Sequence, residues 1–211
     1  RIGTNGDGVN DARERNVISG NASGGNANVN ILGAGTNNNV VAGNYIGTNA
    51  AGTAALTNSG RGVRIATGAA FNRIGTDGSN DAFNENERNI IAGINSAAVF
   101  IVSANDNVVA GNWVGLNAGG TAAIGNANEG ISVSGSQRTR IGTNADGLHD
   151  DLEANVVVAS GTFGIQLADS GTTLNVVAGN LIGTNPAGTV AMPNPLGGMR
   201  IGNAPTRHLI A

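Results

Sequence analysis

Apolar residues recur two positions apart in short runs along the chain, and Gly and Asn residues separate the runs. Side chains two apart in an extended chain share a face, so each run predicts a short strand with one buried face. The runs are of three types, which follow one another in a fixed order. The inward residues of the first type are Val29/Ile31, Val63/Ile65, Val99/Ile101, Ile131/Val133, Ile165/Leu167 and Met199/Ile201. Those of the second type are Ile2, Val41, Ile74, Val109, Ile141 and Val177, and those of the third are Ile18, Ile46, Ile91, Val114, Val157 and Ile182.

The chain also repeats itself over a longer period. The segments "NVVAGNYIGTNAAGTAAL", "NVVAGNWVGLNAGGTAAI" and "NVVAGNLIGTNPAGTVAM" begin at Asn39, Asn107 and Asn175, so the period is 107 − 39 = 175 − 107 = 68 residues. Each repeat divides into two similar halves, which predicts a solenoid with three short parallel strands per coil. We expect residues 1–211 to form one all-β domain of about six coils. Because the chain begins inside a repeat, we expect it to be part of a longer protein.

An Asn stands two residues before the inward residue of most second and third strands. These residues are Asn16, Asn39, Asn44, Asn72, Asn89, Asn107, Asn112, Asn155, Asn175 and Asn180. On stacked coils their side-chain amides are expected to form ladders, each amide bonding the next coil. Asn also tolerates the left-handed corner conformation, so the same residues turn the chain.

The N-x-I/V spacing and the segments "NVISGN", "NVVAGNYIGT" and "GVRI" resemble the repeats of the right-handed parallel β-helix family. The resemblance covers essentially the whole chain and implies a right-handed solenoid. Such repeats recur in large secreted and cell-surface bacterial proteins and in polysaccharide-degrading enzymes. We therefore expect a bacterial protein that is extracellular or at the cell surface, although the fold alone does not determine its function.

Insertions are expected to alternate between two corners of the coil. The inward residues of the second and third strands are 5 apart for Val41 and Ile46 but 16 apart for Ile2 and Ile18. Alternate coils therefore carry an extra loop at this corner, and the other coils carry a neutral insertion such as "TNAAGTAALTNSGR" at the next corner. We interpret the neutral insertions as compact surface loops.

The insertion at the first corner is rich in aspartate and occurs as "RIGTNGDGVNDARERN", "RIGTDGSNDAFNENERN" and "RIGTNADGLHDDLEAN", starting at residues 1, 73 and 140. Its oxygen-bearing groups follow the EF-hand spacing, except that Gly occupies the first ligand position. Oxygen ligands in a chain without Cys favour Ca²⁺ over zinc or copper. The expected ligands are Asn5, Asp7, the Val9 carbonyl, Asp11 and Glu14, then Asn144, Asp146, the Leu148 carbonyl, Asp150 and Glu153. The second copy keeps Asp77 and Asp81 but has Asn84 where the closing Glu is expected, with Glu85 and Glu87 nearby.

The same residues also suit a polar corner without a metal ion. Asp-Gly and Asn-Asp are turn-forming pairs, and Glu14 and Glu153 can hold backbone amides or Arg. The Arg that precedes each loop can pair with the loop, as Arg73 can with Asp77 or Asp81. The sequence is therefore compatible with both interpretations, a calcium site and a polar corner without a metal ion.

Catalysis within these residues is not favoured. Asp150 and Asp151 beside His149 are the strongest acid–base candidates, yet Asp7 and Asp11 occur in an equivalent loop, which favours a structural role. The paired-aspartate and Gly-His-Gly motifs of polygalacturonases are missing. The main hypothesis is a structural or adhesive module, and the alternative is a fragment of a polysaccharide lyase or glycoside hydrolase.

An outward-facing apolar row accompanies the third strands. Its members are Val17, Tyr45, Ile90, Trp113, Val156 and Leu181. Such a stripe either contacts another chain or a ligand, or is covered by the loops. Tyr45 and Trp113, two coils and therefore ~10 Å apart, are candidate binding residues for a carbohydrate or a protein surface.

Composition narrows the partners. The net charge is −3 and all 11 basic residues are Arg without a basic run, so nucleic acid is not expected. No apolar stretch approaches the ~18 residues of a membrane span. The ends have the pattern of uncapped coils, so end-to-end association is expected.

Overall fold

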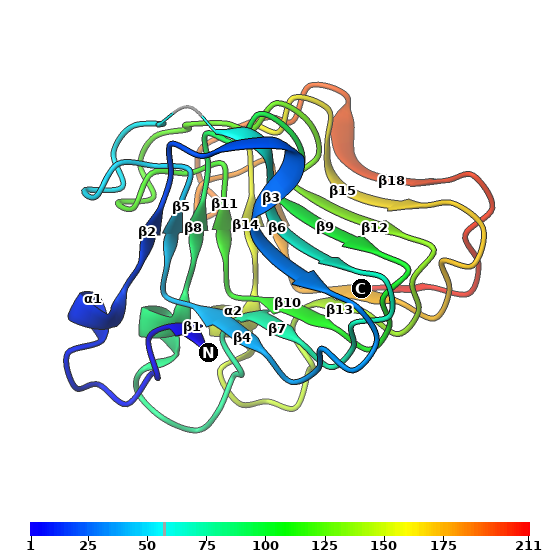
Figure 1. Ribbon diagram of the computed structural model, residues 1–211, viewed down its shortest axis with the longest axis horizontal. Helices are drawn as coiled ribbons and strands as arrows, with labels where there is room; N and C mark the ends of the chain where they lie inside the picture. The colour runs from blue at the N-terminus through cyan, green and yellow to red at the C-terminus, as the bar shows by residue number, and fades with distance from the viewer. Residues whose placement is uncertain (57) are drawn as a thin grey trace.

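The chain is described by a computed structural model covering residues 1–56 and 58–211. It winds into a right-handed parallel β-helix whose three sides are parallel sheets (Figure 1). Among the described residues, helix is limited to the single turns α1 (Asp11–Glu14), η1 (Asn84–Glu87) and α2 (Asp150–Glu153). The predicted all-β solenoid with three strands per coil is confirmed.

Sheet A contains the second strand type. Its seven strands are β1 (Ile2–Gly3), β4 (Val40–Ala42), β7 (Arg73–Gly75), β10 (Val108–Ala110), β13 (Arg140–Gly142), β16 (Val176–Ala178) and β19 (Leu209–Ile210). The register places Val109 between Ile74 and Ile141, as the inward pattern predicts. The last strand, β19, continues the sheet beyond the six predicted rows.

Sheet B contains the third strand type. Its six strands are β2 (Val17–Ile18), β5 (Tyr45–Ile46), β8 (Ile90–Ile91), β11 (Trp113–Val114), β14 (Val156–Val157) and β17 (Leu181–Ile182). Trp113 pairs with Ile90 on one side and Val156 on the other, so the outward apolar row is continuous.

Sheet C contains the first strand type and has the longest strands. They are β3 (Ala22–Leu32), β6 (Ser59–Ala66), β9 (Val99–Val102), β12 (Ile131–Ser134), β15 (Phe163–Ala168) and β18 (Gly197–Gly202). The pairing of β3 with β6 shifts register between Ala22 and Ala27, where β3 extends beyond the predicted strand.

Stacked inward residues form one core along the solenoid. Ile74, Ile91 and Ile131 are fully buried, and burying each such side chain contributes roughly 1.5–3 kcal/mol. Ile18 and Met199 are only partly buried, because each lies in an outermost strand with one stacking neighbour. Ile201, predicted as inward, is 49% exposed for the same reason.

The predicted Asn ladder at the entrance to sheet B is continuous. Its members are Asn16, Asn44, Asn89, Asn112, Asn155 and Asn180, and each Nδ2 donates to the Oδ1 of the next at 2.8–3.1 Å. Backbone amides add to it, as Asn112 N donates to Asn155 Oδ1 at 3.0 Å. The polar groups of this corner are therefore satisfied inside the protein, which removes the penalty of burying them.

The ladder at the entrance to sheet A is interrupted. Its members are Asn39, Asn72, Asn107, Thr139, Asn175 and His208. Thr139 donates its amide to Asn175 Oδ1 at 2.7 Å, but its buried hydroxyl has no partner among the described residues. At the other end, the His208 ring accepts the Asn175 amide at 3.3 Å, and burial lowers the pKa of that histidine.

A third polar row, at the corner between sheets B and C, was not predicted. Asn126 Oδ1 accepts the amide of Ile94 at 3.0 Å, and Asn194 Oδ1 accepts that of Ser160 at 2.9 Å. Asn58 stands in the same row of bridges. The Asn residues alternate with Ile94 and Ser160, so no continuous Asn pattern marks this row in the sequence.

Candidate functional site

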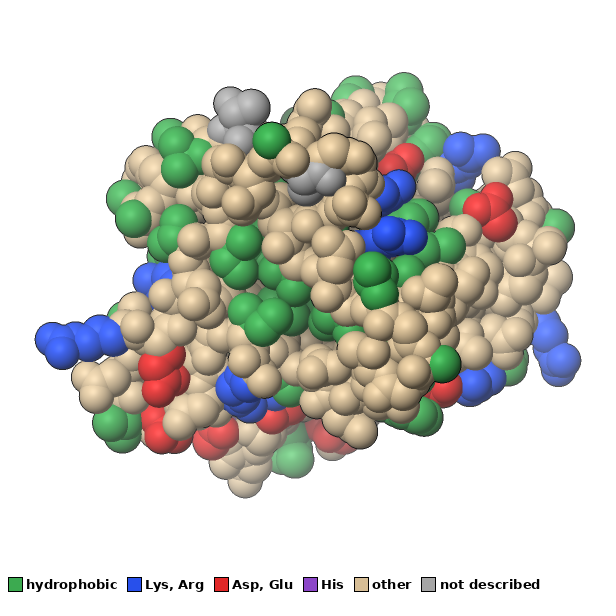
Figure 2. All heavy atoms as spheres, in the orientation of Figure 1, with side chains coloured by type: hydrophobic (Ala, Val, Ile, Leu, Met, Phe, Trp, Pro, Cys, Tyr) green, Lys and Arg blue, Asp and Glu red, His purple; other side chains and the backbone are tan. Residues whose placement is uncertain are grey.

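The aspartate loops lie at the corner between sheets A and B. They occupy residues 4–16, 76–89 and 143–155, and each contains one of the three helical turns. Figure 2 shows Asp and Glu side chains gathered along the lower left of the molecule, where Figure 1 places these loops.

In the first loop, the aspartates bind the loop's own backbone. Asp7 Oδ1 accepts the amide of Val9 at 2.8 Å, and Asp11 Oδ2 accepts the amide of Gly8 at 3.0 Å. The Thr4 hydroxyl donates to the other oxygen of Asp11. Both side chains therefore bond back to the turn, Asp11 from a buried position and Asp7 from an exposed one.

Glu14 closes the same loop. Its Oε2 accepts the amide of Asn5 at 2.9 Å, which joins the end of the loop to its beginning. The Asn5 side chain donates to Asp7 Oδ2 at 2.8 Å. The predicted residues are thus brought together in one hydrogen-bonded loop.

The third loop repeats this construction. The equivalent bonds join Leu148 N to Asp146, Gly147 N to Asp150 and Asn144 N to Glu153, at 2.8, 3.0 and 2.8 Å. The Thr143 hydroxyl donates to Asp150, as Thr4 does to Asp11. Two segments 139 residues apart by number (143 − 4 = 139) therefore fold alike, because their polar spacing is the same.

The second loop corrects the sequence alignment. Its closing residue is Glu87, whose Oε2 accepts the Asp77 amide at 3.1 Å. Asn84 does not replace the closing Glu; it takes the place of Asp11 and is bonded by the Thr76 hydroxyl. One additional residue between Thr76 and Asn84 shifts the spacing, so the alignment that placed Asn84 at the closing position is wrong.

Asp81 accepts hydrogen bonds inside the second loop, near its additional residue. Its carboxylate accepts the Ser79 hydroxyl at 2.7 Å and the Phe83 amide at 2.8 Å. It therefore lies apart from Arg73, which pairs with Asp77 at 3.3 Å, one of the two pairings that the sequence suggested.

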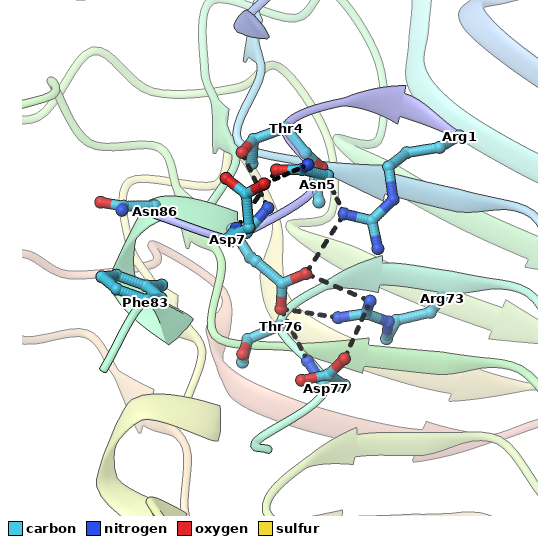
Figure 3. Close-up of polar contacts among 12 residues, drawn as sticks. Arg1, Thr4, Asn5, Asp7, Arg73, Thr76, Asp77, Phe83 and Asn86 are labelled. Atoms are coloured by element: carbon cyan, nitrogen blue, oxygen red, sulfur yellow. Dashed lines mark hydrogen bonds and ion pairs between the residues drawn. The ribbon is translucent and has the colours of Figure 1, made fainter. Parts of the chain in front are cut away.

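Each of the last two loops buries an Arg–Glu pair. Arg140 Nη1 lies 2.8 Å from Oε1 of Glu153, which is 0% exposed, and Arg73 Nη1 lies 2.8 Å from Oε2 of the buried Glu87. Arg1 also lies near the Glu87 carboxylate, at 3.7 Å. Figure 3 shows Arg1 and Arg73 turned toward one carboxylate. A buried carboxylate is stable only when it is paired in this way.

Successive loops contact one another across the coil between them. Asn86 Nδ2, in the second loop, donates to Asp11 Oδ2 in the first at 2.7 Å. The intervening coil turns at Gly43, where an added Cβ would lie 2.6 Å from the carbonyl oxygen of Asn86. Gly111 stands in the same relation to the carbonyl of Leu152 in the third loop. Glycine at these two positions lets the loops stack into one column.

The hydrogen bonds shift the titration of the loop aspartates. Burial alone would raise the pKa of Asp11, but donors from Thr4, Asn86 and Gly8 hold that pKa below its usual value. The Thr143 hydroxyl is the main reason that the pKa of Asp150 is lowered. Both carboxylates are therefore held in their charged form as acceptors.

Of the two interpretations of these loops, the hydrogen bonds favour the polar corner, and calcium binding is the alternative to be tested. The residues 1–56 and 58–211 contain no group of three or more His, Asp or Glu side chains arranged to hold a metal ion. The carboxylate oxygens of Asp7, Asp11 and Glu14 each accept an amide of their own loop. A cation here would have to compete with those amides for the same oxygens.

The aromatic residues of the outer row are covered on both sides. The Arg15 guanidinium lies 4.2 Å above the Tyr45 ring, and that of Arg88 lies 4.4 Å above the Trp113 ring. The neutral hairpins cover them from the other corner, since a Cβ at Gly52 would meet the Tyr45 ring at 2.9 Å. The two rings are therefore partly covered by the protein's own loops, whereas Val17 at the end of the row is exposed, and binding by Tyr45 or Trp113 stays a prediction.

A cleft of about 580 Å³ opens beside Trp113, between the loop column and the hairpins. Its walls include Arg88, Ala154, Leu181 and Pro186, and its rim carries Asp151. A volume of this size is typical of small-ligand sites. Burial lowers the pKa of Arg88, whose Nε is buried without a partner among the described residues.

The sequence interpretation missed Arg15 and Arg88. Each stands directly before a ladder residue, Asn16 or Asn89, and this shared position was the available signal. Their aromatic partners lie on the next coil, so the contact is not visible as a local pattern.

Comparison with known proteins identifies no relative: no protein-family model, curated protein or solved structure matches the chain. In the described part of the chain, no helix has the length and apolar character needed to cross a membrane.

Proposed function

We propose that this chain is a structural and binding module of a bacterial secreted or cell-surface protein. The observation that supports it is that the repeated loop carboxylates, with the exposed Asp151 as the exception, accept hydrogen bonds or ion pairs within the corner itself. A catalytic carboxylate has to reach a substrate and exchange a proton with it. Asp150 instead accepts the Thr143 hydroxyl and the Gly147 amide, and Glu153 is fully buried against Arg140.

The long polar ladders support the same role. Six Asn residues linked across successive coils brace the solenoid along its axis. A braced rod of this kind holds surface groups at fixed separations, which suits a spacer or a binding surface. End-to-end pairing of copies would lengthen such a rod and stays a prediction.

The test measures binding and turnover on the same panel of polysaccharides. We expect no release of reducing ends or unsaturated products, and we expect surface display of the module to increase the attachment of a non-adherent bacterium to one class of coated surface. Asp151→Asn is compared with the unchanged chain. The exposed Asp151 side chain makes no hydrogen bond that holds the loop, so this substitution should leave the fold intact. Product formation that disappears in Asp151→Asn or Asp150→Asn would instead identify a polysaccharide-active enzyme.

A further inference from the structure

The third aspartate loop lacks a contact that the first two make with sheet B. Arg15 covers Tyr45 and Arg88 covers Trp113. In the third loop the position of these arginines is taken by Ala154, which directly precedes the ladder residue Asn155. The position of the aromatic partner is taken by Leu181, which pairs with Val156 in the next strand of sheet B.

The backbone at the three positions is nevertheless the same. The φ and ψ angles are −58° and 129° at Arg15, −60° and 122° at Arg88, and −59° and 124° at Ala154. A side chain at position 154 therefore leaves the backbone in the direction that Arg15 and Arg88 take. The space over Leu181 is the space that an arginine would fill.

The groups that hold an arginine in the earlier loops are still present around this space. Gly179 lines the cleft and is equivalent to Gly43, whose carbonyl accepts Arg15 Nε at 3.2 Å. Asp151 stands three residues before Ala154, as Glu85 stands three before Arg88, and Glu85 lies 4.0 Å from that guanidinium. Asp151 itself has no hydrogen bond or ion pair with the described residues.

The charge of the cleft also suits a cation. Its ionisable side chains are Glu85, Asp151 and Arg88, which give −1 − 1 + 1 = −1. Arg88 is already placed over Trp113 and beside Glu85, so Asp151 is the carboxylate left for a guest. Leu152, Leu181 and Pro186 supply apolar surface for an aliphatic stem.

We propose that this cleft binds the guanidinium group of a guest arginine side chain, with its stem on Leu181 and its head group beside Asp151. The guest would complete in trans the contact that Arg15 and Arg88 make in cis. The inference does not depend on the proposed adhesive role, because it rests on the geometry of the third loop alone.

The single tryptophan, Trp113, lines the cleft and reports on it by fluorescence. The probe is N-acetyl-L-arginine amide, titrated at low ionic strength so that salt does not screen the contact. The control probe is the citrulline amide, which has nearly the same shape but no charge. We expect the arginine probe to bind about tenfold more tightly than the citrulline probe, which is the scale of one charge-assisted contact.

Two variants complete the test. Asp151→Asn should remove the preference for arginine over citrulline, and Ala154→Arg should fill the cleft from within and abolish binding of the probe. Glu14→Gln, far along the loop column, should leave binding unchanged. Equal binding of the two probes, or undiminished arginine binding by Asp151→Asn or Ala154→Arg, would overturn the proposal. Circular dichroism of each variant confirms that the solenoid is intact.

Discussion

The two corners that flank sheet B both carry insertions on alternate coils, but they satisfy their polar groups in opposite ways. The neutral insertions are small hairpins closed by antiparallel bridges such as Thr48–Ala55 and Leu116–Ala123. Asn117 Oδ1 accepts the amide of Thr121 at 2.8 Å within its own hairpin, and Asn49 does the same for Thr53. The side-chain bonds of these loops lie within each hairpin, and the Ala118 amide of one hairpin donates to the Gly52 carbonyl of the previous one at 2.8 Å.

The aspartate loops instead connect their charges to the coil. Glu153 and Glu87 are buried against arginines that belong to sheet A, and the loops bond one another through Asn86 and Asp11. In Figure 2 the carboxylates lie over these loops, whereas the hairpins at the upper left show only apolar and uncharged side chains. The difference teaches that the partners of an insertion, rather than its length, decide how strongly it is coupled to the fold.

The largest effect should come from Glu153→Ala, in the aspartate loop that buries its closing carboxylate. Removing one partner of a buried ion pair leaves Arg140 uncompensated, and the free energy of unfolding should fall by about 4 kcal/mol. Glu14→Ala, at the exposed copy of the same position, should cost less than about 1 kcal/mol, since only one hydrogen bond is lost. Urea unfolding of the two variants measures both. Equal losses would contradict the proposed coupling through the buried pair.

A glycine pair isolates the close packing of the loop column. Gly111 and Gly188 have the same φ of +69°, but an added Cβ at Gly111 would lie 2.6 Å from the Leu152 carbonyl, whereas none of the described atoms lies within 4 Å at Gly188. Gly188→Ala should cost about 1 kcal/mol from backbone strain alone. Gly111→Ala should cost about 3 kcal/mol because it adds overpacking to that strain. Thermal unfolding of both variants gives the comparison, and similar losses would show that the loops are not tightly stacked.

The smallest expected effect is a change in how the free energy of unfolding depends on pH. The folded pKa of Asp11 is lowered, so its stabilising contribution is present above the unfolded value of about 3.9 and is lost as pH falls through the folded pKa. Thr4→Val removes a donor that lowers this pKa, so the variant should lose less stability than the wild type between about pH 5 and the folded pKa. The matched change Thr53→Val, in a hairpin without a titratable partner, should lower stability equally at every pH. A Thr4→Val difference that does not change with pH would contradict the assignment.

Much of the fold could be predicted from the sequence because the inward apolar residues recur at every second position of each strand. Rows such as Ile74, Val109 and Ile141 were predicted correctly, since the two-residue side-chain period of a strand leaves a single face for them. The Asn ladders were predictable for the same reason. The row through Asn126 was not, because every second member is a different residue type.

The candidate site was predicted less completely. The loops and their polar residues were found, but the role of Glu87 was missed because one additional residue displaced it from the expected spacing. The contacts of Arg15 and Arg88 were missed because they join residues of different coils. The cleft beside Leu181 follows from the absence of such a contact and requires the structure to be seen.

The central claim, that the aspartate corner is complete through its own hydrogen bonds, is tested most directly by melting the chain in chelator and in millimolar calcium. The amides of Val9 and Gly8 already occupy Asp7 and Asp11, so the account predicts the same melting temperature in both conditions. A melting temperature that rises with calcium, and loses that dependence when Asp7 and Asp146 are both replaced by Ala, would contradict the account and establish the loops as calcium sites.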